Sequence, residues 1–272
     1  MRVAVVSDIH GNLPALDAVL ADIARAGVDL IVNLGDIVSG PLWPLETARR
    51  LMALDLPTMR GNHERQLLTI PLERQCDSDA QASRALGDAE RAWLAGLPTA
   101  LRLADDLQAC HGTPASDLQY LLETVVDGFD ADAARAGRED TRGVRAATTD
   151  EVTARIGATL GRGALLCGHS HVPRVVDLPQ GLLVVNPGSV GLQAYDDDHP
   201  LPHWVETGGP AARWALLERA RDGRWTAALH ATAYDHGAAA ARAEANGRGD
   251  WADALRTGRV GRTEGDVLGR PA

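Results

Sequence analysis

Side chains that can bind a divalent metal follow the apolar runs of this chain repeatedly. Asp8 and His10 come just after the run at residues 3–6, and Asp36 comes just after the run at residues 30–34. The complete set of such candidates is Asp8, His10, Asp36, Asn62, His63, Glu64, His111, His169 and His171. One such motif would carry little weight, but four separate motifs, with a fifth candidate at His111, predict a site for two metal ions. A fold that gathers the ends of several strands at one place can build such a site.

Short β-branched runs alternate with helical patterns over the first 110 residues, which predicts βαβ units with parallel strand pairs. The strands that we expect span residues 3–6, 30–34, 58–60, 100–103, 107–110, 164–167, 174–178, 182–185, 212–219 and 224–231. The helices that we expect span residues 13–26, 44–54, 78–96 and 149–160, with helix and loop over 120–143. The predicted fold class is α/β, a four-layer αββα sandwich with two mixed β-sheets and a dinuclear metal site at the C-terminal ends of strands. Residues 1–236 form the predicted domain, and residues 237–272 form a C-terminal helical extension or tail.

The donor types predict which metals suit the site. Asp, His and Asn without a thiolate make an oxygen and nitrogen site, which suits Mn, Fe, Zn, Ni or Co and holds too much imidazole for Ca or Mg. In an extended segment, Asp8 and His10 would turn their side chains to the same face and reach one ion. We expect Cys110 and Cys167 to pack as small hydrophobic residues, because free cysteine is so often buried.

Composition excludes some classes of function. A formal net charge of -10 and a pI near 5.3 argue against a non-specific nucleic-acid binder, which needs a basic face. A small anionic substrate remains compatible with this charge if metals supply positive charge locally. No apolar run approaches the ~18 residues of a membrane span, and residues 1–6 lead straight into the first motif. We therefore expect no membrane segment, no signal peptide and a cytoplasmic location.

The order of these motifs resembles that of the calcineurin-like metallophosphoesterase superfamily over roughly residues 1–195. The motifs are Asp8-x-His10, Gly35-Asp36, Gly61-Asn62-His63-Glu64, His111-Gly112 and Gly168-His169-x-His171. The compact size and the stretch Asn186-Pro187-Gly188-Ser189 are most similar to the small bacterial and archaeal phosphodiesterase branch. The resemblance implies that Asp8, His10 and His171 bind the first metal ion, that Asn62, His111 and His169 bind the second, and that Asp36 bridges them. On this basis the imidazoles of His169 and His171 should diverge, each to its own ion.

The resemblance also implies roles for the neighbours of these ligands. His63 lies beside the leaving oxygen in the family and is the candidate catalytic group, although the sequence does not name a carboxylate partner for it. Asn62 and His63 are candidate substrate contacts, and Arg65 is a weaker one, since a solvated surface arginine would show the same pattern. We expect solvated acidic loops at Asp196-Asp197-Asp198-His199 and Asp235-His236, and packing of the C-terminal extension by Trp204, Trp214, Trp225 and Trp251.

The function implied by the resemblance is hydrolysis of phosphodiester or related phosphate-ester and pyrophosphate bonds by a hydroxide shared between two divalent ions. The expected partner is a small phosphorylated molecule, nucleotides included, and a homo-oligomer is left open. Two alternatives remain: a phosphomonoesterase or protein phosphatase, and a non-catalytic scaffold on the same fold. The scaffold is disfavoured because no ligand position is replaced, and the protein phosphatase because the Gly35-Asp36 motif lacks a longer extension.

Overall fold

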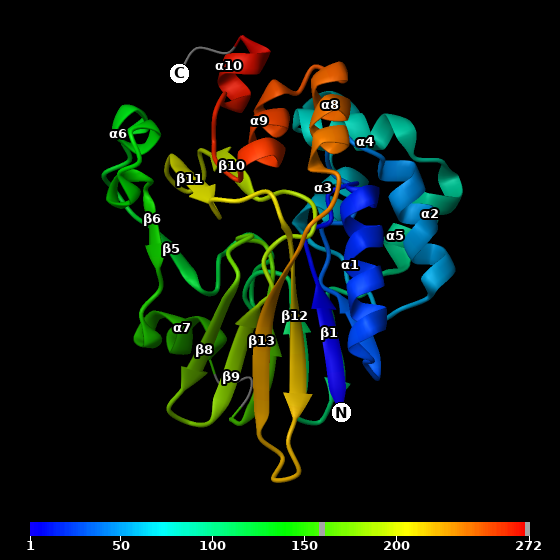
Figure 1. Cartoon of the computed structure of the whole chain (residues 1–272), viewed down its shortest axis with the longest axis vertical. Helices are drawn as coiled ribbons and strands as arrows, with labels where there is room; N and C mark the ends of the chain where they lie inside the picture. The colour runs from blue at the N-terminus through cyan, green and yellow to red at the C-terminus, as the bar shows by residue number, and fades with distance from the viewer. Residues whose placement is uncertain (158–160, 270–272) are drawn as a thin grey trace.

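Two β-sheets lie face to face in the computed structural model of the chain, which describes residues 1–157 and 161–269 (Figure 1). The first sheet has the order β13–β12–β1–β2, with β13 at Trp225–Thr232, β12 at Ala212–Arg219, β1 at Arg2–Val6 and β2 at Leu30–Asn33. The second has the order β3–β4–β7–β9–β8, with β3 at Ala100–Ala104, β4 at Leu107–Cys110, β7 at Gly163–Leu166, β9 at Leu182–Asn186 and β8 at Arg174–Leu178. In the first sheet β1 is parallel to β2 and antiparallel to β12, and in the second β7 is parallel to β9 while β8 is antiparallel to it. The prediction of two mixed sheets is confirmed.

Helices cover the outer face of each sheet. On the first sheet lie α1 at Leu13–Ala26, α2 at Pro44–Leu54, α3 at Asn62–Thr69, α4 at Asp77–Ala85 and α5 at Asp88–Gly96, and on the second lies α7 at Thr149–Ile156. Strand β1 shows how the layers are built, because Val3 and Val5 face the core between the sheets while Ala4 and Val6 face the helices. Since both faces of β1 are buried, its sequence is a continuous apolar run. The predicted four-layer αββα arrangement is confirmed.

Clear end signals explain why α1 agrees with its predicted range. Asn12 caps the helix by accepting the N–H of Ala15 at 3.2 Å, and Pro14 occupies the first turn, where a missing N–H costs nothing. At the other end, Gly27 adopts a left-handed conformation with φ 66°, and its N–H bonds back to Ile23. Helix α2 likewise spans the predicted residues 44–54.

Three other predicted elements differ from the structure. The single helix expected over residues 78–96 is wrong, because the chain is extended at Gly87 and the N–H of Gly87 donates to Glu90 Oε2 at 3.1 Å, which starts a new helix. The strand expected at residues 58–60 is reduced to one bridge between Asn33 and Thr58. The helix expected over residues 149–160 ends at Ile156, and residues 158–160 lie outside the described part of the chain.

Two small sheets lie beside the sandwich. One pairs β5 (Glu123–Val125) with β6 (Val144–Ala146), and the other pairs β10 (Ala194–Asp197) with β11 (His203–Glu206). The short helices nearby are α6 at Ala131–Arg135 and the 3₁₀ turn η2 at Glu139–Thr141, and a further 3₁₀ turn, η1, follows α3 at Leu72–Arg74. The expectation of a solvated acidic loop is wrong for Asp196, because this residue lies in β10 and its carboxylate accepts the N–H of Glu264 at 3.2 Å.

Helices α8 (His236–Ala245), α9 (Gly249–Thr257) and α10 (Glu264–Leu268) complete the described chain and lie above the strand ends in Figure 1. Asp235, which we expected in a solvated loop, is exposed in the connection before α8 and also caps this helix by accepting the N–H of Ala238 at 2.9 Å. The expectation for the tryptophans holds for Trp204 and Trp251, which pack in the core around α8 and α9. Trp214 and Trp225 belong instead to the cores on the two faces of the first sheet. None of the helices in the described ranges combines the length and apolar character that a membrane crossing requires.

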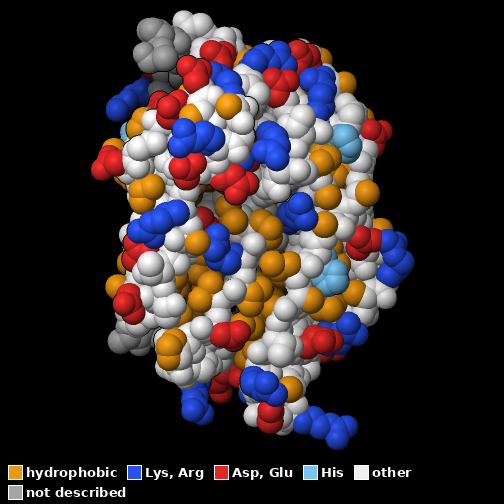
Figure 2. Space-filling model, turned by 60° about the vertical axis from the view of Figure 1, so that its left-hand side comes forward, with side chains coloured by type: hydrophobic (Ala, Val, Ile, Leu, Met, Phe, Trp, Pro, Cys, Tyr) orange, Lys and Arg blue, Asp and Glu red, His pale blue; other side chains and the backbone are white. Residues whose placement is uncertain are grey.

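The core between the two sheets reaches the surface along one side of the molecule. Figure 2 shows this face, where hydrophobic side chains gather in a hollow below the centre of the view. The edge strands β8 and β13 border the hollow, and Val175, Leu183 and Ala227 line it. All three side chains also pack in the inter-sheet core, so this face is an open edge of the sandwich.

Candidate metal centre

The predicted ligands come together at one end of the two sheets, just beyond the strands that carry them. The strand-borne candidates are Asp8 and His10 after β1, Asp36 after β2, His111 after β4, and His169 and His171 after β7. Asn62 and His63 instead open helix α3. Because β1 and β7 belong to the two stacked sheets and both end at this edge of the sandwich, Asp8 and His169 become neighbours although 161 positions separate them.

The backbone at these positions adopts a conformation that side chains rarely allow. Among the described residues, six that are not glycine have a positive φ, and five of them are candidate ligands: Asp8 (54°), His10 (50°), Asp36 (52°), His169 (68°) and His171 (58°). Each left-handed residue costs about 1–2 kcal/mol, and such costs persist at functional sites, where the surrounding structure enforces them. The extended segment expected for Asp8-x-His10 is therefore wrong, although the two side chains still enter one group.

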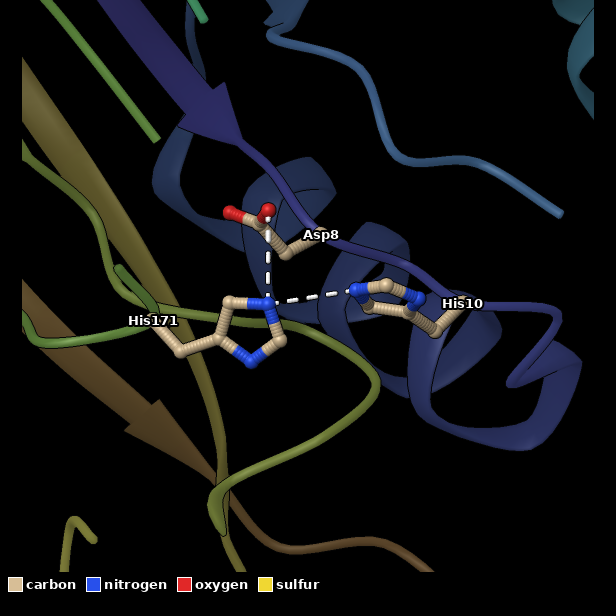
Figure 3. Close-up of side chains that lie close together, drawn as sticks. All are labelled: Asp8, His10 and His171. Atoms are coloured by element: carbon tan, nitrogen blue, oxygen red, sulfur yellow. Dashed lines mark hydrogen bonds and ion pairs between the residues drawn. The ribbon is translucent and has the colours of Figure 1, made fainter. Parts of the chain in front are cut away.

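Asp8, His10 and His171 form the first group of candidate ligands (Figure 3). One ligand atom from each residue can be chosen so that all three atoms lie within 4.8 Å of one another. His171 Nε2 is 3.5 Å from Asp8 Oδ1 and 3.1 Å from His10 Nε2. All three residues are buried, so these polar atoms have little access to solvent.

The Nδ1 atoms of His10 and His171 help to explain the 3.1 Å contact between the Nε2 atoms of these two rings. His10 Nδ1 donates to the carbonyl oxygen of Ser39 at 2.8 Å, and His171 Nδ1 donates to that of Leu192 at 2.7 Å, because a carbonyl can only accept. In the neutral form of either ring, Nε2 therefore carries a lone pair and no proton. Burial and the neighbouring His171 lower the pKa of His10 to about 3, which keeps its ring neutral. Two facing lone pairs fit a shared cation, and metal-binding histidines usually donate their other N–H in this way.

Asp36, His111 and His169 form the second group. His111 Nδ1 donates to the carbonyl oxygen of Leu34 at 2.8 Å, while His111 Nε2 lies 3.0 Å from Asp36 Oδ2 and 3.1 Å from Asn62 Oδ1. With the proton on Nδ1, three acceptor atoms converge, which again suits a cation. Burial opposes a charge on His111, yet Asp36 raises the pKa of His111 to about 9, so the group strongly favours a positive charge at this point.

The two histidines that follow β7 point to different groups. His171 belongs to the first group and His169 to the second, which is the divergence that the family resemblance implies. The backbone N–H of His169 lies 3.2 Å from each carboxylate oxygen of Asp8, so Asp8 links the two groups. Gly168 makes this approach feasible, because a Cβ at Gly168 would lie only 2.9 Å from Asp8 Oδ2.

Glu64 holds the loops of the second group together without belonging to that group. Its carboxylate accepts backbone N–H groups from Asp36 at 2.9 Å, Ile37 at 2.7 Å and Gly61 at 2.9 Å. Burial and repulsion from Asp36 raise the pKa of Glu64 to about 7, while the N–H donors act in the opposite direction. Glu64 was visible in the sequence as part of a motif, but its positioning role follows only from the fold.

Asp79 is the carboxylate partner of His63 that the sequence did not reveal. Asp79 Oδ1 lies 2.9 Å from His63 Nδ1. Burial disfavours a charge on His63, but Asp79 and Asp36 outweigh burial and raise the pKa of His63 well above its usual range. Asp79 lies in α4, 16 positions after His63, and no motif marks it.

Two other residues near the site are engaged by protein partners. Arg65 forms a bidentate pair with Asp117, with Nε to Oδ2 at 2.6 Å and Nη2 to Oδ1 at 2.9 Å. Arg65 is also absent from the described residues that line the cleft over the site, so both observations argue against a substrate contact. Ser189 Oγ donates to the backbone oxygen of Asp8 at 2.7 Å and accepts the N–H of Leu192 at 2.8 Å, which ties the loop after β9 to the end of β1.

A cleft of about 1090 Å³ opens over both groups. Its walls include three aromatic residues that each contact a candidate ligand. The ring centroids lie 5.7 Å apart for Trp251 and His10, 4.8 Å for Tyr195 and His171, and 5.0 Å for Tyr120 and His169. Because Trp251 belongs to α9, the C-terminal helices form part of the site.

Comparisons with known proteins identify relatives of this chain. An uncharacterised protein of Methanocaldococcus jannaschii is 45% identical over 62 residues, which cover 23% of this chain and 26% of that protein, so the match spans about a quarter of that relative. A metallophosphoesterase structure from Sphaerobacter thermophilus aligns with a TM-score of 0.63 and 23% identity over 95% of this chain and 99% of that chain. The structure of a hypothetical protein from Pyrococcus horikoshii aligns with a TM-score of 0.68 and 20% identity over 96% of this chain and 99% of that chain. At these identities the two structures support the fold alone.

A family model gives the broader assignment. The calcineurin-like phosphoesterase superfamily domain matches residues 1–200, well over half of the 272 residues. All of the candidate ligands lie within this range, at the strand ends described above. The chain therefore belongs to the calcineurin-like phosphoesterase superfamily.

Proposed function

We propose that this chain hydrolyses phosphodiester or related phosphate-ester bonds of small molecules at a centre that holds two divalent metal ions. The observation that supports this most directly is the pair of adjoining groups, in each of which imidazole nitrogens and a carboxylate oxygen converge within 4.8 Å of one another. The proposed ligands are Asp8, His10 and His171 for one ion, Asn62, His111 and His169 for the other, and Asp36 for both. Mn, Fe, Zn, Ni and Co all suit these oxygen and nitrogen donors.

The bound ions would supply a water of lowered pKa as the nucleophile and would neutralise charge on the phosphoryl oxygens. The contribution of the chain to bond cleavage comes from His63. Asp79 accepts the proton on His63 Nδ1, which leaves Nε2 to donate a proton to the departing oxygen as the bond to phosphorus breaks. The centroids of the His63 and His10 rings are 5.4 Å apart, so His63 lies beside the first group.

The charges around the cleft favour a diester over a monoester. Three arginines line the cleft in residues 1–157 and 161–269, and each already has partners. These are the carbonyls of Leu121 and Glu123 for Arg155, Asp250 for Arg248, and Asp253 with Glu244 for Arg262. A monoester carries about two negative charges near neutral pH and would find no unengaged guanidinium among these lining residues. A diester carries one charge and needs less compensation.

The size of the cleft favours a substrate with a substantial organic group. A volume of about 1090 Å³ is at the upper end for small-molecule sites and far exceeds what one phosphate fills. Trp251 and Tyr195 place aromatic rings beside the first group, where they can contact a flat organic group such as a base. Nucleotide-derived diesters are therefore among the substrates to test.

The first experiment compares two esters on protein that has been stripped with a chelator and reloaded with one metal at a time. Turnover of bis(p-nitrophenyl) phosphate is measured beside that of p-nitrophenyl phosphate. We expect metal-dependent hydrolysis, with kcat/KM roughly tenfold higher for the diester. A higher kcat/KM for the monoester would favour the phosphomonoesterase alternative. No turnover of either ester with any of the five metals would favour the non-catalytic scaffold.

A matched pair of variants tests the ligand assignment. Asp36 and Asp55 are both aspartates with left-handed backbone, at φ 52° and 50°, and asparagine tolerates this conformation well. Asp36 belongs to the second group, whereas Asp55 is exposed at the end of α2. We expect Asp36→Asn to lower metal content and to reduce kcat/KM by roughly 10²-fold, and Asp55→Asn to behave like wild type. Equal activity of the two variants would refute the assignment.

A further inference from the structure

A third group of metal-binding side chains lies beside the two groups described above. His63, Cys76 and Asp79 each offer one ligand atom, and these atoms lie within 4.8 Å of one another. All three residues line the cleft. The group also brings a thiol to the cleft, which neither of the first two groups contains.

We propose that His63, Cys76 and Asp79 form an inhibitory site for zinc, or for another divalent cation that prefers sulfur, distinct from the centre that serves hydrolysis. The site takes one ion, with water as the fourth ligand. Binding of the ion is independent of the proposed function. The inhibitory effect rests on that function, because it acts through His63.

The local structure brings the three side chains to one place. Cys76 is the N-cap residue of α4, and Asp79 lies three positions further, so both side chains face the same side of the helix. His63 comes from the first turn of the neighbouring helix α3, and its Nδ1 lies 2.9 Å from Asp79 Oδ1. The Cys76 sulfur lies within 4.8 Å of the ligand atoms of both His63 and Asp79.

The exposure of the three residues fits the arrival of an ion from solution. The side chain of Asp79 is 2% exposed, whereas that of His63 is 25% exposed and Cys76 is an exposed free cysteine. An ion in the cleft would therefore meet the thiol and the imidazole first. The buried carboxylate would then complete the protein ligands from behind.

The donor set suits zinc. Zinc binds cysteine sulfur, histidine nitrogen and carboxylate oxygen in tetrahedral sites, and sulfur ligands select it over metals such as manganese that prefer oxygen. Binding releases the proton of the Cys76 thiol, after which the thiolate and the Asp79 carboxylate balance the two positive charges of the ion. Cys76 makes no capping hydrogen bond at the start of α4.

Zinc at this site would remove His63 from its proposed role. The ion would occupy the Nδ1 position whose proton Asp79 now accepts, and Asp79 would bind the ion instead. With zinc on Nδ1 the ring would keep its Nε2 proton but would no longer be an imidazolium, and a neutral ring is a much weaker proton donor to the leaving oxygen. Hydrolysis should slow although the other two groups keep their ions.

Cobalt titration tests binding without any measurement of enzyme activity. The full chain is titrated with Co²⁺, whose bond to a thiolate absorbs in the near ultraviolet. We expect wild type to bind a third equivalent with this absorption, and Cys76→Ser to bind two equivalents without it. Cys110→Ala changes a buried cysteine outside the group and should match wild type. An absorption that persists in Cys76→Ser, or that is missing in wild type, would overturn the proposed site.

Zinc titration of manganese-loaded protein tests the inhibition. We expect added Zn²⁺ to lower wild-type turnover of bis(p-nitrophenyl) phosphate by roughly tenfold, while Cys76→Ser keeps its turnover. Without added zinc, the two proteins should be equally active. Equal inhibition of both proteins would place the inhibitory zinc elsewhere and overturn the proposal. If neither protein hydrolyses any ester, the proposed function fails, and the cobalt titration still decides whether the zinc site exists.

Discussion

A methyl group added at Gly61 should disable the metal centre without removing a single polar atom from it. A Cβ at Gly61 would lie 2.7 Å from His111 Cε1 and 2.8 Å from Asp36 Cγ, and closer still to Asp36 Oδ1. Ordinary contacts of a Cβ begin at 3.4 Å, so the His111 ring would have to move by about 0.7 Å and the Asp36 carboxylate oxygen further still. Both side chains are buried and hydrogen-bonded, and Glu64 holds the Gly61 N–H from the other side.

The size of this movement sets the expected effect. A misplacement of 1 Å at a reacting group can cost roughly 10²-fold in rate. For Gly61→Ala we therefore expect kcat/KM to fall by roughly tenfold to 10²-fold. Because the added methyl group overpacks a buried site, the free energy of unfolding should also fall by about 1–3 kcal/mol.

Gly96→Ala is the matched control. A Cβ at Gly96 would meet nothing within 4 Å, and Gly96 lies at the end of α5, so alanine should be neutral or stabilise by up to ~1 kcal/mol. The assays are turnover of bis(p-nitrophenyl) phosphate, metal content after dialysis, and unfolding in urea. Wild-type metal content together with wild-type turnover in Gly61→Ala would refute the argument that Asp36 and His111 act from their present positions.

Three further changes probe other parts of the molecule. In Glu64→Gln an amide replaces the carboxylate that accepts three N–H groups, so the free energy of unfolding measured in urea should fall by about 1–3 kcal/mol. Glu73 is exposed, so the control Glu73→Gln should leave the free energy of unfolding unchanged. Burial raises the pKa of Asp196 from 3.8 to about 6, so its contribution to stability is full below pH 3.8 and is lost as the pH rises through 6. The free energy of unfolding of Asp196→Asn should therefore equal that of wild type at acid pH and exceed it by up to about 3 kcal/mol near neutral pH. A difference in unfolding free energy that does not vary with pH would contradict this. Trp251→Ala removes a ring that is 6% exposed and should lower the free energy of unfolding by about 3–5 kcal/mol; it should also raise KM for aromatic diesters more than it lowers kcat.

Strong local signals made some elements predictable to the residue. Helix α1 has regularly spaced apolar residues, a capping Asn12 and a terminal Gly27, all of which act within a few positions of one another. Helix α3 has no such pattern, because Leu67 is its one buried apolar residue and its buried polar residues serve the site. The break at Gly87 depends on a side chain three positions away, which a continuous helical pattern conceals.

The candidate site shows the same division between local and distant causes. The grouping of Asp8 with His171 was predictable, since each follows a strand and the strands end together. The left-handed backbone of these residues was not predictable, because tertiary contacts impose it against local preference. The partnership of Asp79 with His63 was also hidden, since it depends on how α4 packs beside α3.

The wall that α9 and α10 contribute to the cleft has a consequence for how this protein could diversify. All of the candidate ligands lie within residues 1–200, whereas Trp251 and its neighbours in the wall lie beyond that range. Only residues 233–235 separate strand β13 from α8. Recombination at this short connection could exchange the wall while the residues that hold the metals stay in place. Descendants of one ancestor could thus share a reaction and diverge in the molecules they accept.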